Sequence, residues 1–266
     1  MAEIILKIRE KIGIMVEAEA ISPESFAGKG KEEIEALLVW QGPEKLPLSR
    51  FFDVELSGSP SASAEETRII MQGDLSRVKR IGEGMKAGSI EIDGPAGMHL
   101  GAEMVGGSIL VKGNAGSWSG REMKGGLLHI KGNCGDHVGS AYRGSWRGMT
   151  GGQIIVDGNA RSQLGGGLAG GQITVEGDVE NFCGIRQSGG MILVRGSAVR
   201  GVGAEMNGGA IAVCKDILQP SPGFVETGRE EDPKLGEVKL EGRYVKYTGD
   251  YALSKNAKGT LYCREV

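Results

Sequence analysis

The feature that most constrains the fold is a pair of adjacent glycines that recurs along the chain. The first members of these pairs are Gly106, Gly125, Gly151, Gly170, Gly189 and Gly208. Successive members differ in sequence number by 19 in four cases and by 26 in one. Residues 66–216 hold 36 of the 47 glycines, whereas the whole chain has only 8 prolines. This regular spacing indicates a repeat protein and excludes collagen and a Pro/Gly-rich disordered chain.

Each repeat also contains a short segment with two aliphatic residues in alternate positions. These pairs are Ile90/Ile92, Ile109/Val111, Leu128/Ile130, Ile154/Val156, Ile173/Val175, Ile192/Val194 and Ile211/Val213. Alternating β-branched residues bounded by glycine are typical of a β-strand, whose other face would carry Glu91, His129 and Thr174. A strand this short is unstable alone. Strands stacked about 4.8 Å apart would each gain a parallel partner on both sides.

The sequence therefore predicts an all-β protein, a parallel β-helix (solenoid) of about eight coils that begins near 69–73. The strand pattern does not give the hand of the helix, and a right-handed parallel β-helix is expected from the general rule for connections between parallel strands. The glycines would supply positive φ angles and close backbone approach at the corners. We expect an N-terminal capping or docking segment at 1–65, the β-helix at 66–216 and a C-terminal capping segment at 217–266. A left-handed hexapeptide fold is excluded, because its coils divide into three six-residue units and a period of 19 does not.

Several finer expectations follow from local composition. We expect strands at 4–8 and 14–19, a helix or strand at 34–40, and a linker at 57–64 that is rich in Ser, Gly and Pro. Short strands are expected in the C-terminal segment at 238–240, 244–247 and 260–263. Methionine or leucine recurs at one position of the repeat and is interpreted as stacked core. These residues are Met85, Met104, Met123, Met149, Leu168 and Met206.

Charge and hydropathy argue against two classes of partner. The net charge is −3 and the pI is near 5.8, whereas nucleic-acid-binding domains are usually basic. No apolar run approaches the roughly 18 residues that span a bilayer, and from the acidic residues at the start we expect no signal peptide. We therefore expect a cytoplasmic protein that binds neither nucleic acid nor membrane. Cys134, Cys183, Cys214 and Cys263 form no CxxC pair, so free thiols are expected.

Residues that could carry chemistry are sparse. His99 and His137 share one repeat position with Trp118 on the coil between them, so their backbones would lie about 10 Å apart, too far to share one metal ion. We interpret them as a solvated or interface column. Asp157 and Glu176 could serve a carbohydrate-cleaving groove, but the scarcity of aromatic residues argues against it. Nucleophile and phosphate-loop motifs are absent, so we predict no catalytic, cofactor-binding or metal-ligating residue.

The one longer interval, 26 in place of 19, contains seven extra positions, Tyr142–Gly148. They would place Tyr142, Arg143, Trp146 and Arg147 on a protrusion from one coil. Tyr, Trp and Arg are the residue types enriched at interface hot spots. An exposed Trp without a partner would also favour aggregation. We therefore predict that these four residues anchor a partner, with a decorated surface loop as the alternative.

The repeat and its insertion resemble a known family. Residues 73–216 resemble the GXGXG β-helix at the C-terminal end of the glutamate synthase large subunit. They are more similar to the C subunit of formylmethanofuran dehydrogenase. The similarity is carried by GNAGSW at 113–118 and GSAYRGSWRGM at 139–149. It extends to FAGK at 26–29 and YTGD at 247–250, and so covers nearly the whole chain.

The resemblance implies a noncatalytic structural subunit of an oxidoreductase complex that catalyses the first step of methanogenesis. In that family, CO2 is reduced to formate at a metal–pterin subunit. Formate is then condensed with methanofuran at a dinuclear metal site in an amidohydrolase-like subunit. Tungsten- or molybdenum-pterin and iron–sulfur clusters would belong to these other subunits, which would be the partners. Two alternatives stay open: the equivalent scaffold of a formyltransferase/hydrolase complex, and a stand-alone carbohydrate-active β-helix.

Overall fold

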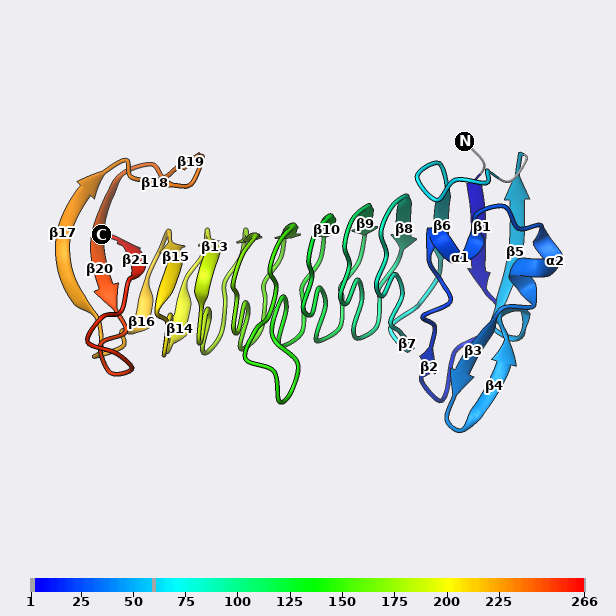
Figure 1. Ribbon diagram of the computed structural model, residues 1–266, viewed down its shortest axis with the longest axis horizontal. Coiled ribbons are helices and arrows are strands. Elements are labelled where there is room, and N and C mark those ends of the chain that lie inside the picture. The colour runs from blue at the N-terminus through cyan, green and yellow to red at the C-terminus, as the bar shows by residue number, and fades with distance from the viewer. Residues whose placement is uncertain (1–2, 59–60, 266) are drawn as a thin grey trace.

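The computed structural model describes residues 3–58 and 61–265. It is an all-β protein, and its main sheet contains 13 strands in the order β17-β20-β21-β15-β13-β12-β11-β10-β9-β8-β6-β1-β5. Successive repeats lie side by side along one long axis, and each adds a neighbouring strand to this sheet (Figure 1). The fold class predicted from the alternating pattern is confirmed at this level.

The central strands follow one another at the repeat spacing. They are β6 (Arg68–Gln72), β7 (Val78–Lys79), β8 (Ser89–Asp93), β9 (Ser108–Val111), β10 (Leu127–Ile130), β11 (Gln153–Val156), β12 (Gln172–Val175), β13 (Ser188–Val194), β14 (Ala198–Arg200), β15 (Gly208–Val213) and β16 (Ile217–Gln219). From β6 to β15, each strand of the main sheet pairs in parallel with the next. Ile154, for example, lies opposite Ile173. A second ladder of isolated parallel bridges links one residue per coil from Leu75 to Ala198.

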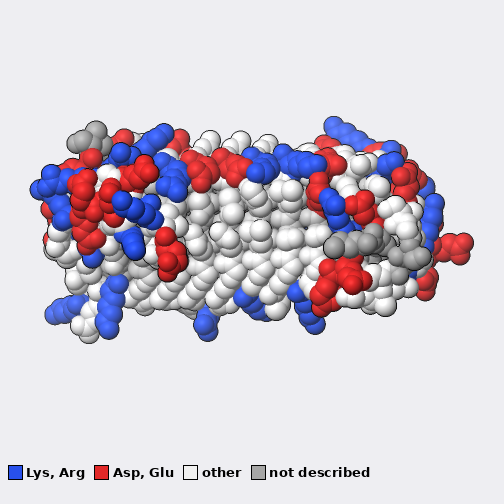
Figure 2. All heavy atoms as spheres, turned by 90° about the horizontal axis from the view of Figure 1, so that it is seen from above, with Lys and Arg blue, Asp and Glu red and all other residues white. Residues whose placement is uncertain are grey.

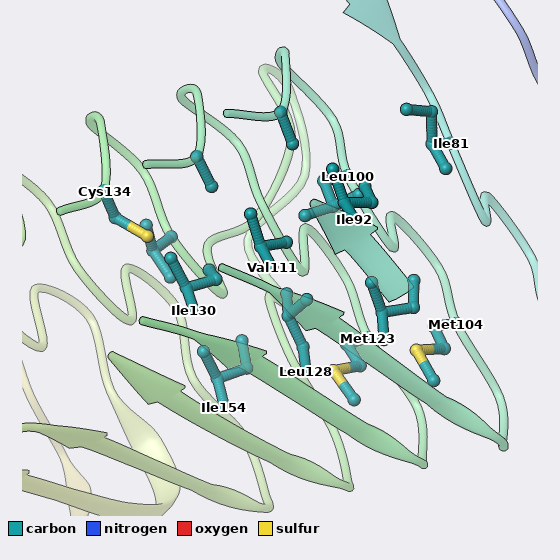
Figure 3. Packing of buried hydrophobic residues seen from close by; sticks show 14 of the residues in the cluster. Ile81, Ile92, Leu100, Met104, Val111, Met123, Leu128, Ile130, Cys134 and Ile154 are labelled. Carbon is teal, nitrogen blue, oxygen red and sulfur yellow. The ribbon is translucent and has the colours of Figure 1, made fainter. Parts of the chain in front are cut away.

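The predicted core is confirmed. All fourteen aliphatic residues of the alternating pairs are at most 1% exposed, and the methionine and leucine column is 0% exposed. Figure 3 shows Met104, Met123, Leu128 and Ile154, from successive coils, inside the same interior. One polar residue in this column was not foreseen. Gln187 occupies the repeat position after Leu168, is fully buried, and donates hydrogen bonds from Nε2 to the carbonyl oxygens of Gly189 and Gly190 at 3.0 Å.

Glycine is required where one coil lies directly on the next. A Cβ on Gly125 would collide with the carbonyl oxygen of Val105 on the preceding coil. At another corner Gly139 has a φ of +66°, and a Cβ there would lie 2.7 Å from Cδ1 of Ile173. Both the close approach and the left-handed backbone favour glycine, as the repeat pattern predicts.

The N-terminal segment contains β1 (Glu3–Ile8), β2 (Val16–Glu17), α1 (Pro23–Phe26), α2 (Lys31–Glu35), β3 (Leu38–Gln41), β4 (Glu44–Pro47), the 3-10 helix η1 (Leu48–Arg50) and β5 (Phe52–Ser57). β1 pairs in parallel with β6 and antiparallel with β5, so this segment extends the main sheet. The strand expected at 14–19 is limited to two residues. The segment 34–40 ends one helix and begins a strand. The linker expected at 57–64 begins inside β5, and its residues 59–60 lie outside the described part.

The C-terminal segment contains β17 (Val225–Glu231), β18 (Lys234–Leu235), β19 (Val238–Lys239), β20 (Arg243–Gly249) and β21 (Gly259–Arg264). β21 continues the parallel stack beyond β15, and β20 and β17 follow in antiparallel order. The hairpin β18–β19 extends back toward the repeats (Figure 1). There it packs on the outer face of the sheet, where Leu193 and Ala212 are buried. The three expected strands are present within one or two residues, whereas β17 was not predicted.

Candidate partner interface

The insertion Tyr142–Gly148 forms a loop that extends below the repeats between β10 and β11 (Figure 1). Both ends of the loop are fixed by backbone hydrogen bonds to the next coil. The N–H of Ala141 donates to the carbonyl oxygen of Gly166, and the N–H of Gly148 donates to that of Gly167, both at 2.8 Å. The loop therefore leaves the repeats from a fixed base.

The four residues predicted as a partner interface are all exposed on this loop. Trp146 is 73% exposed and Tyr142 44% exposed, and Arg143 and Arg147 are also exposed. The guanidinium of Arg186 lies 4.7 Å from the centroid of the Trp146 ring. This cation–π contact orients the indole while leaving most of it open to a partner. The structure thus brings together the loop and a cation that the sequence did not single out.

The residues at the repeat position of His99 form a stack of rings beside the loop. The Trp118 and His137 rings are parallel within 9° and 4.0 Å apart, and His99 lies 6.2 Å from Trp118 on the other side. The edge of the Tyr142 ring contacts Trp118, with centroids 5.6 Å apart. Trp118 is only 9% exposed, so the central residue of the column is not solvated, and an interface column stays a prediction. The cause of this burial is the stacking of both imidazoles and Tyr142 around the indole.

The backbone under this stack is strained. His99, Trp118 and His137 have φ angles of +60°, +65° and +63°, in the left-handed region that non-glycine residues rarely adopt. Each such residue costs on the order of 1 kcal/mol. The hydrogen bonds between coils hold these corners, including those from the N–H of His99 to Ser117 and from the N–H of Trp118 to Asp136. The ring stack is therefore a fixed part of the surface.

A nearly buried arginine supports the same surface from behind. The Arg121 side chain is 9% exposed, and its guanidinium forms ion pairs with Glu103 at 2.9 Å, Glu83 at 3.2 Å and Glu122 at 3.4 Å. Its head group also lies 4.6 Å from the centroid of the Tyr142 ring. Glu103 and Glu122 occupy the same position of successive repeats, so the stack places two like charges together and Arg121 separates them. That recurrence is the sequence signal that could have indicated a cation here.

The two histidines of the stack are uncharged at neutral pH. Burial first, and then the positive charges of Arg121 and Arg80, lower the pKa of His99 from 6.5 to about 4. Burial also lowers the pKa of His137. The stack is thus an apolar, aromatic surface flanked by arginines.

A pocket of about 370 Å³ lies between the loop and the following repeats, which contribute Gly166, Gly167 and Arg186 to its lining. Its lining includes Trp118, His137, Tyr142, Arg143 and Trp146. The loop and the ring stack therefore form one continuous surface, which we call the aromatic face and define by His99, Trp118, His137 and Tyr142–Gly148.

A second exposed apolar patch, at the N-terminal end, was missed by the sequence reasoning. Ile14, Met15, Leu38 and Trp40 are between 39% and 66% exposed, and Lys45 lies over the Trp40 ring at 4.7 Å. A pocket of about 510 Å³ includes three of these four side chains in its lining. Their exposure depends on the non-repeating strands β2 and β3, so no periodic signal marks them.

The remaining candidates for chemistry are held in structural contacts. Burial raises the pKa of the Cys134 and Cys183 thiols to about 12, which leaves both thiols protonated at neutral pH. Burial would raise the pKa of Asp157, but hydrogen bonds with His129 at 2.8 Å and Lys131 outweigh this and lower it. The carboxylate is therefore an ion-pair partner and is unsuited to act as a general acid.

Metal ligands and membrane spans can be judged for residues 3–58 and 61–265. In these ranges no three His, Cys, Asp or Glu side chains lie close enough together to hold a metal ion. The described residues therefore do not fit a ligand set for the metal–pterin, iron–sulfur or dinuclear centres that the resemblance assigns to other subunits. No helix in these ranges is long and apolar enough to cross a bilayer.

The fold and this surface define the class: a repeat protein of stacked parallel strands that exposes a rigid aromatic and basic face. Curated relatives show which repeat protein it is similar to. The C subunit of the molybdenum-containing formylmethanofuran dehydrogenase 1 of Methanosarcina barkeri is 59% identical over 100 residues, covering 38% of this chain and 33% of the relative. The C subunit of the tungsten-containing formylmethanofuran dehydrogenase 2 of Methanothermobacter thermautotrophicus is 45% identical over 102 residues, covering 38% and 37%. The aligned part thus spans about a third of each relative's length.

A solved structure extends the similarity to the whole fold. A chain of the formyltransferase/hydrolase complex from Methylorubrum extorquens, in complex with methylofuran, matches with a TM-score of 0.84 at 26% identity. The match covers 98% of this chain and 100% of that one. No protein-family model matches the chain. The predicted resemblance is confirmed: this chain is a homologue of the C subunit of formylmethanofuran dehydrogenase.

Proposed function

We propose that this chain is the noncatalytic structural subunit of a formylmethanofuran dehydrogenase complex. Its fold in that role is a right-handed parallel β-helix of about eight coils at 66–216, with capping segments at 1–65 and 217–266. A stack of coils that share one core is rigid and can hold two catalytic subunits in a fixed relation. The partners would be the metal–pterin subunit and the amidohydrolase-like subunit, and these would carry the tungsten or molybdenum, iron–sulfur and dinuclear metal sites.

The observation that carries this proposal is the exposure of Trp146 on a loop with a fixed base. An indole that is 73% exposed, oriented by Arg186 and beside further exposed arginines, has the composition of an interface hot spot. Because the loop ends are hydrogen-bonded to the next coil, little further entropy is lost when a partner binds. Tyr142, Arg143, Trp146 and Arg147 are therefore the proposed anchors.

The test replaces Trp146 by Ala in the full-length chain and measures the partners that co-purify from native cells. We expect a loss of partner affinity of about 2 kcal/mol or more, because a central aromatic anchor is removed. The melting temperature of the isolated chain should not change, since the indole contributes little to its core. Leu218→Ala is the matched control, because Leu218 is 65% exposed on β16, away from the loop. Equal recovery of partners with both variants would refute the interface.

A second candidate function is the equivalent scaffold of a formyltransferase/hydrolase complex. It is supported by the structural match over 98% of this chain, whereas the higher identity, 59% over 100 residues, favours the dehydrogenase. Mass spectrometry of the partners retained by the wild-type chain separates the two functions. Recovery of a metal–pterin subunit supports the dehydrogenase, and recovery of formyltransferase and hydrolase subunits without it supports the alternative.

A further inference from the structure

The C-terminal end of the sheet has a ladder of two arginines with a small residue between them. Val194 lies opposite Val213, and Val213 lies opposite Cys263 on the next strand. The residues that follow these three, Arg195, Cys214 and Arg264, therefore lie in one column at the ends of β13, β15 and β21. The two arginine backbones are separated by two strand spacings, about 10 Å. The short Cys214 side chain leaves a hollow between the two long ones.

This hollow, which we call the basic hollow, is a pocket of about 310 Å³. It is lined by Arg195, Cys214, Lys215, Lys239, Glu241, Tyr244 and Arg264. Its floor is buried, since Tyr244 is 1% exposed and Cys214 8% exposed. The charged residues around it are all exposed. Charged head groups thus surround a preformed depression instead of projecting separately from the surface.

The basic hollow has an excess of positive charge. Four of its lining residues are cations and one is a carboxylate, a net charge of 4 − 1 = +3, although the whole chain has a net charge of −3. Lys239 has an acidic partner, because its ammonium pairs with Asp232 at 2.8 Å. Within residues 3–58 and 61–265, the cations Arg195, Lys215 and Arg264 form no ion pair with a carboxylate.

Acidic residues are available nearby, yet they do not neutralise this group. Glu176 follows β12 as Arg195 follows β13, so the two lie in the same column, but their side chains form no ion pair in the described part of the chain. Glu265, which follows Arg264, pairs instead with Arg229 at 3.1 Å and Arg243 at 3.0 Å. Burial and a hydrogen bond with Cys214 raise the pKa of the Tyr244 phenol, and the positive charges of Arg264 and Arg195 oppose that increase.

We propose that the basic hollow binds an oxyanion with two negative charges, such as a phosphate group or a pair of carboxylates. Two guanidinium groups on opposite sides of a depression can each donate a pair of N–H bonds to such a group. Lys215 adds a third positive charge, and the positive charge of the site attracts the negative charge of the ligand. The site lies at the ends of β13, β15 and β21, with further lining from β19 and β20, and includes no residue of the aromatic face.

Isothermal titration of the full-length chain with inorganic phosphate, and separately with succinate, tests this site at constant ionic strength. We expect saturable binding of at least one anion, weakened about tenfold or more in the double variant Arg195→Gln/Arg264→Gln. The matched control is Arg9→Gln/Arg50→Gln, which removes the same charge from exposed arginines at the other end and should bind like wild type. Arg195→Lys/Arg264→Lys should bind with intermediate affinity, because the charge remains but the paired donors are lost.

The two anions distinguish the source of the ligand. Tighter binding of phosphate assigns a phosphate group to the site, and tighter binding of succinate assigns paired carboxylates. Lys215→Gln is the second variant if the double variant does not fold, and it should also weaken binding. The proposal is overturned if neither anion binds, or if all variants and the control bind equally.

Discussion

At the scale of single residues, His99 makes the stability of the protein depend on pH. Burial, and then Arg121 and Arg80, lower its folded-state pKa to about 4, whereas the unfolded chain has the ordinary value of about 6.5. Between these values the unfolded state binds a proton that the folded state does not. The contribution of His99 to stability is therefore fully present above about pH 6.5 and is lost progressively as the pH falls to about 4.

His99→Gln, which cannot titrate, isolates this effect. Because His99 is only half-buried, we discount for solvent screening and expect wild type to lose about 1–2 kcal/mol more unfolding free energy than the variant between neutral pH and about pH 4.5. Urea denaturation at each pH measures the difference, and NMR titration of the imidazole gives the pKa directly. If the unfolding free energies of wild type and His99→Gln changed equally with pH, or if His99 titrated near its ordinary pKa, the lowered pKa of His99 in the ring stack would be contradicted.

At the scale of the repeat, the contact between coils predicts which glycines can be replaced. A Cβ on Gly125 would collide with the carbonyl oxygen of Val105, so Gly125→Ala should cost about 1–3 kcal/mol of unfolding free energy. Gly13 has no atom within 4 Å of an added Cβ and lies outside the repeats, so Gly13→Ala should change stability by less than about 0.5 kcal/mol. Thermal or urea unfolding compares the two variants. Equal losses would show that the coils are less tightly apposed than the structure describes.

The direct contact between successive coils also explains how much of the fold could be predicted from the sequence. Each coil meets a nearly identical coil, so strands, core column and glycines repeat at one period and can be counted. Gln187 breaks the methionine column without breaking the fold, because the backbone carbonyls of Gly189 and Gly190 accept its hydrogen bonds. The charged strand β17 lies outside the repeat and had no apolar alternation to mark it.

The candidate interface could be predicted only in part, because only the loop is marked by a change in the repeat spacing. The change of one repeat interval from 19 to 26 locates the loop and its four exposed residues directly. Arg186 and Arg121 reach Trp146 and Tyr142 from other coils, so these contacts depend on how side chains orient across the stack. The exposed patch around Trp40 depends on non-repeating strands. Composition and spacing do not contain that information.

At the scale of the whole molecule, the two open ends of the main sheet could pair with the edge strands of other molecules. Every inner strand has two partners, and only β5 and β17 are edges among the described residues. The edge strand β17 carries exposed Glu226, Arg229 and Glu231, and charged side chains gather at both ends of the molecule in Figure 2. Charges at an edge oppose pairing with another chain. At the other end, helix α2 packs against β5 and buries Ile34. Both ends therefore have features that oppose pairing of this sheet with the sheet of another molecule.

Removal of residues 225–266 tests whether the C-terminal segment has this protective role. The truncation would expose the edge of β15 and uncover Leu193 and Ala212, which are 1% and 0% exposed in the full chain. An open apolar edge favours pairing between molecules, so the truncated chain should form oligomers that light scattering detects, whereas the full chain should not. Adding Leu193→Lys and Ala212→Lys to the truncated chain should reduce this association, because the uncovered surface then carries charge. A truncated chain that stays monomeric at the same concentration would show that β17–β21 do not protect the stack.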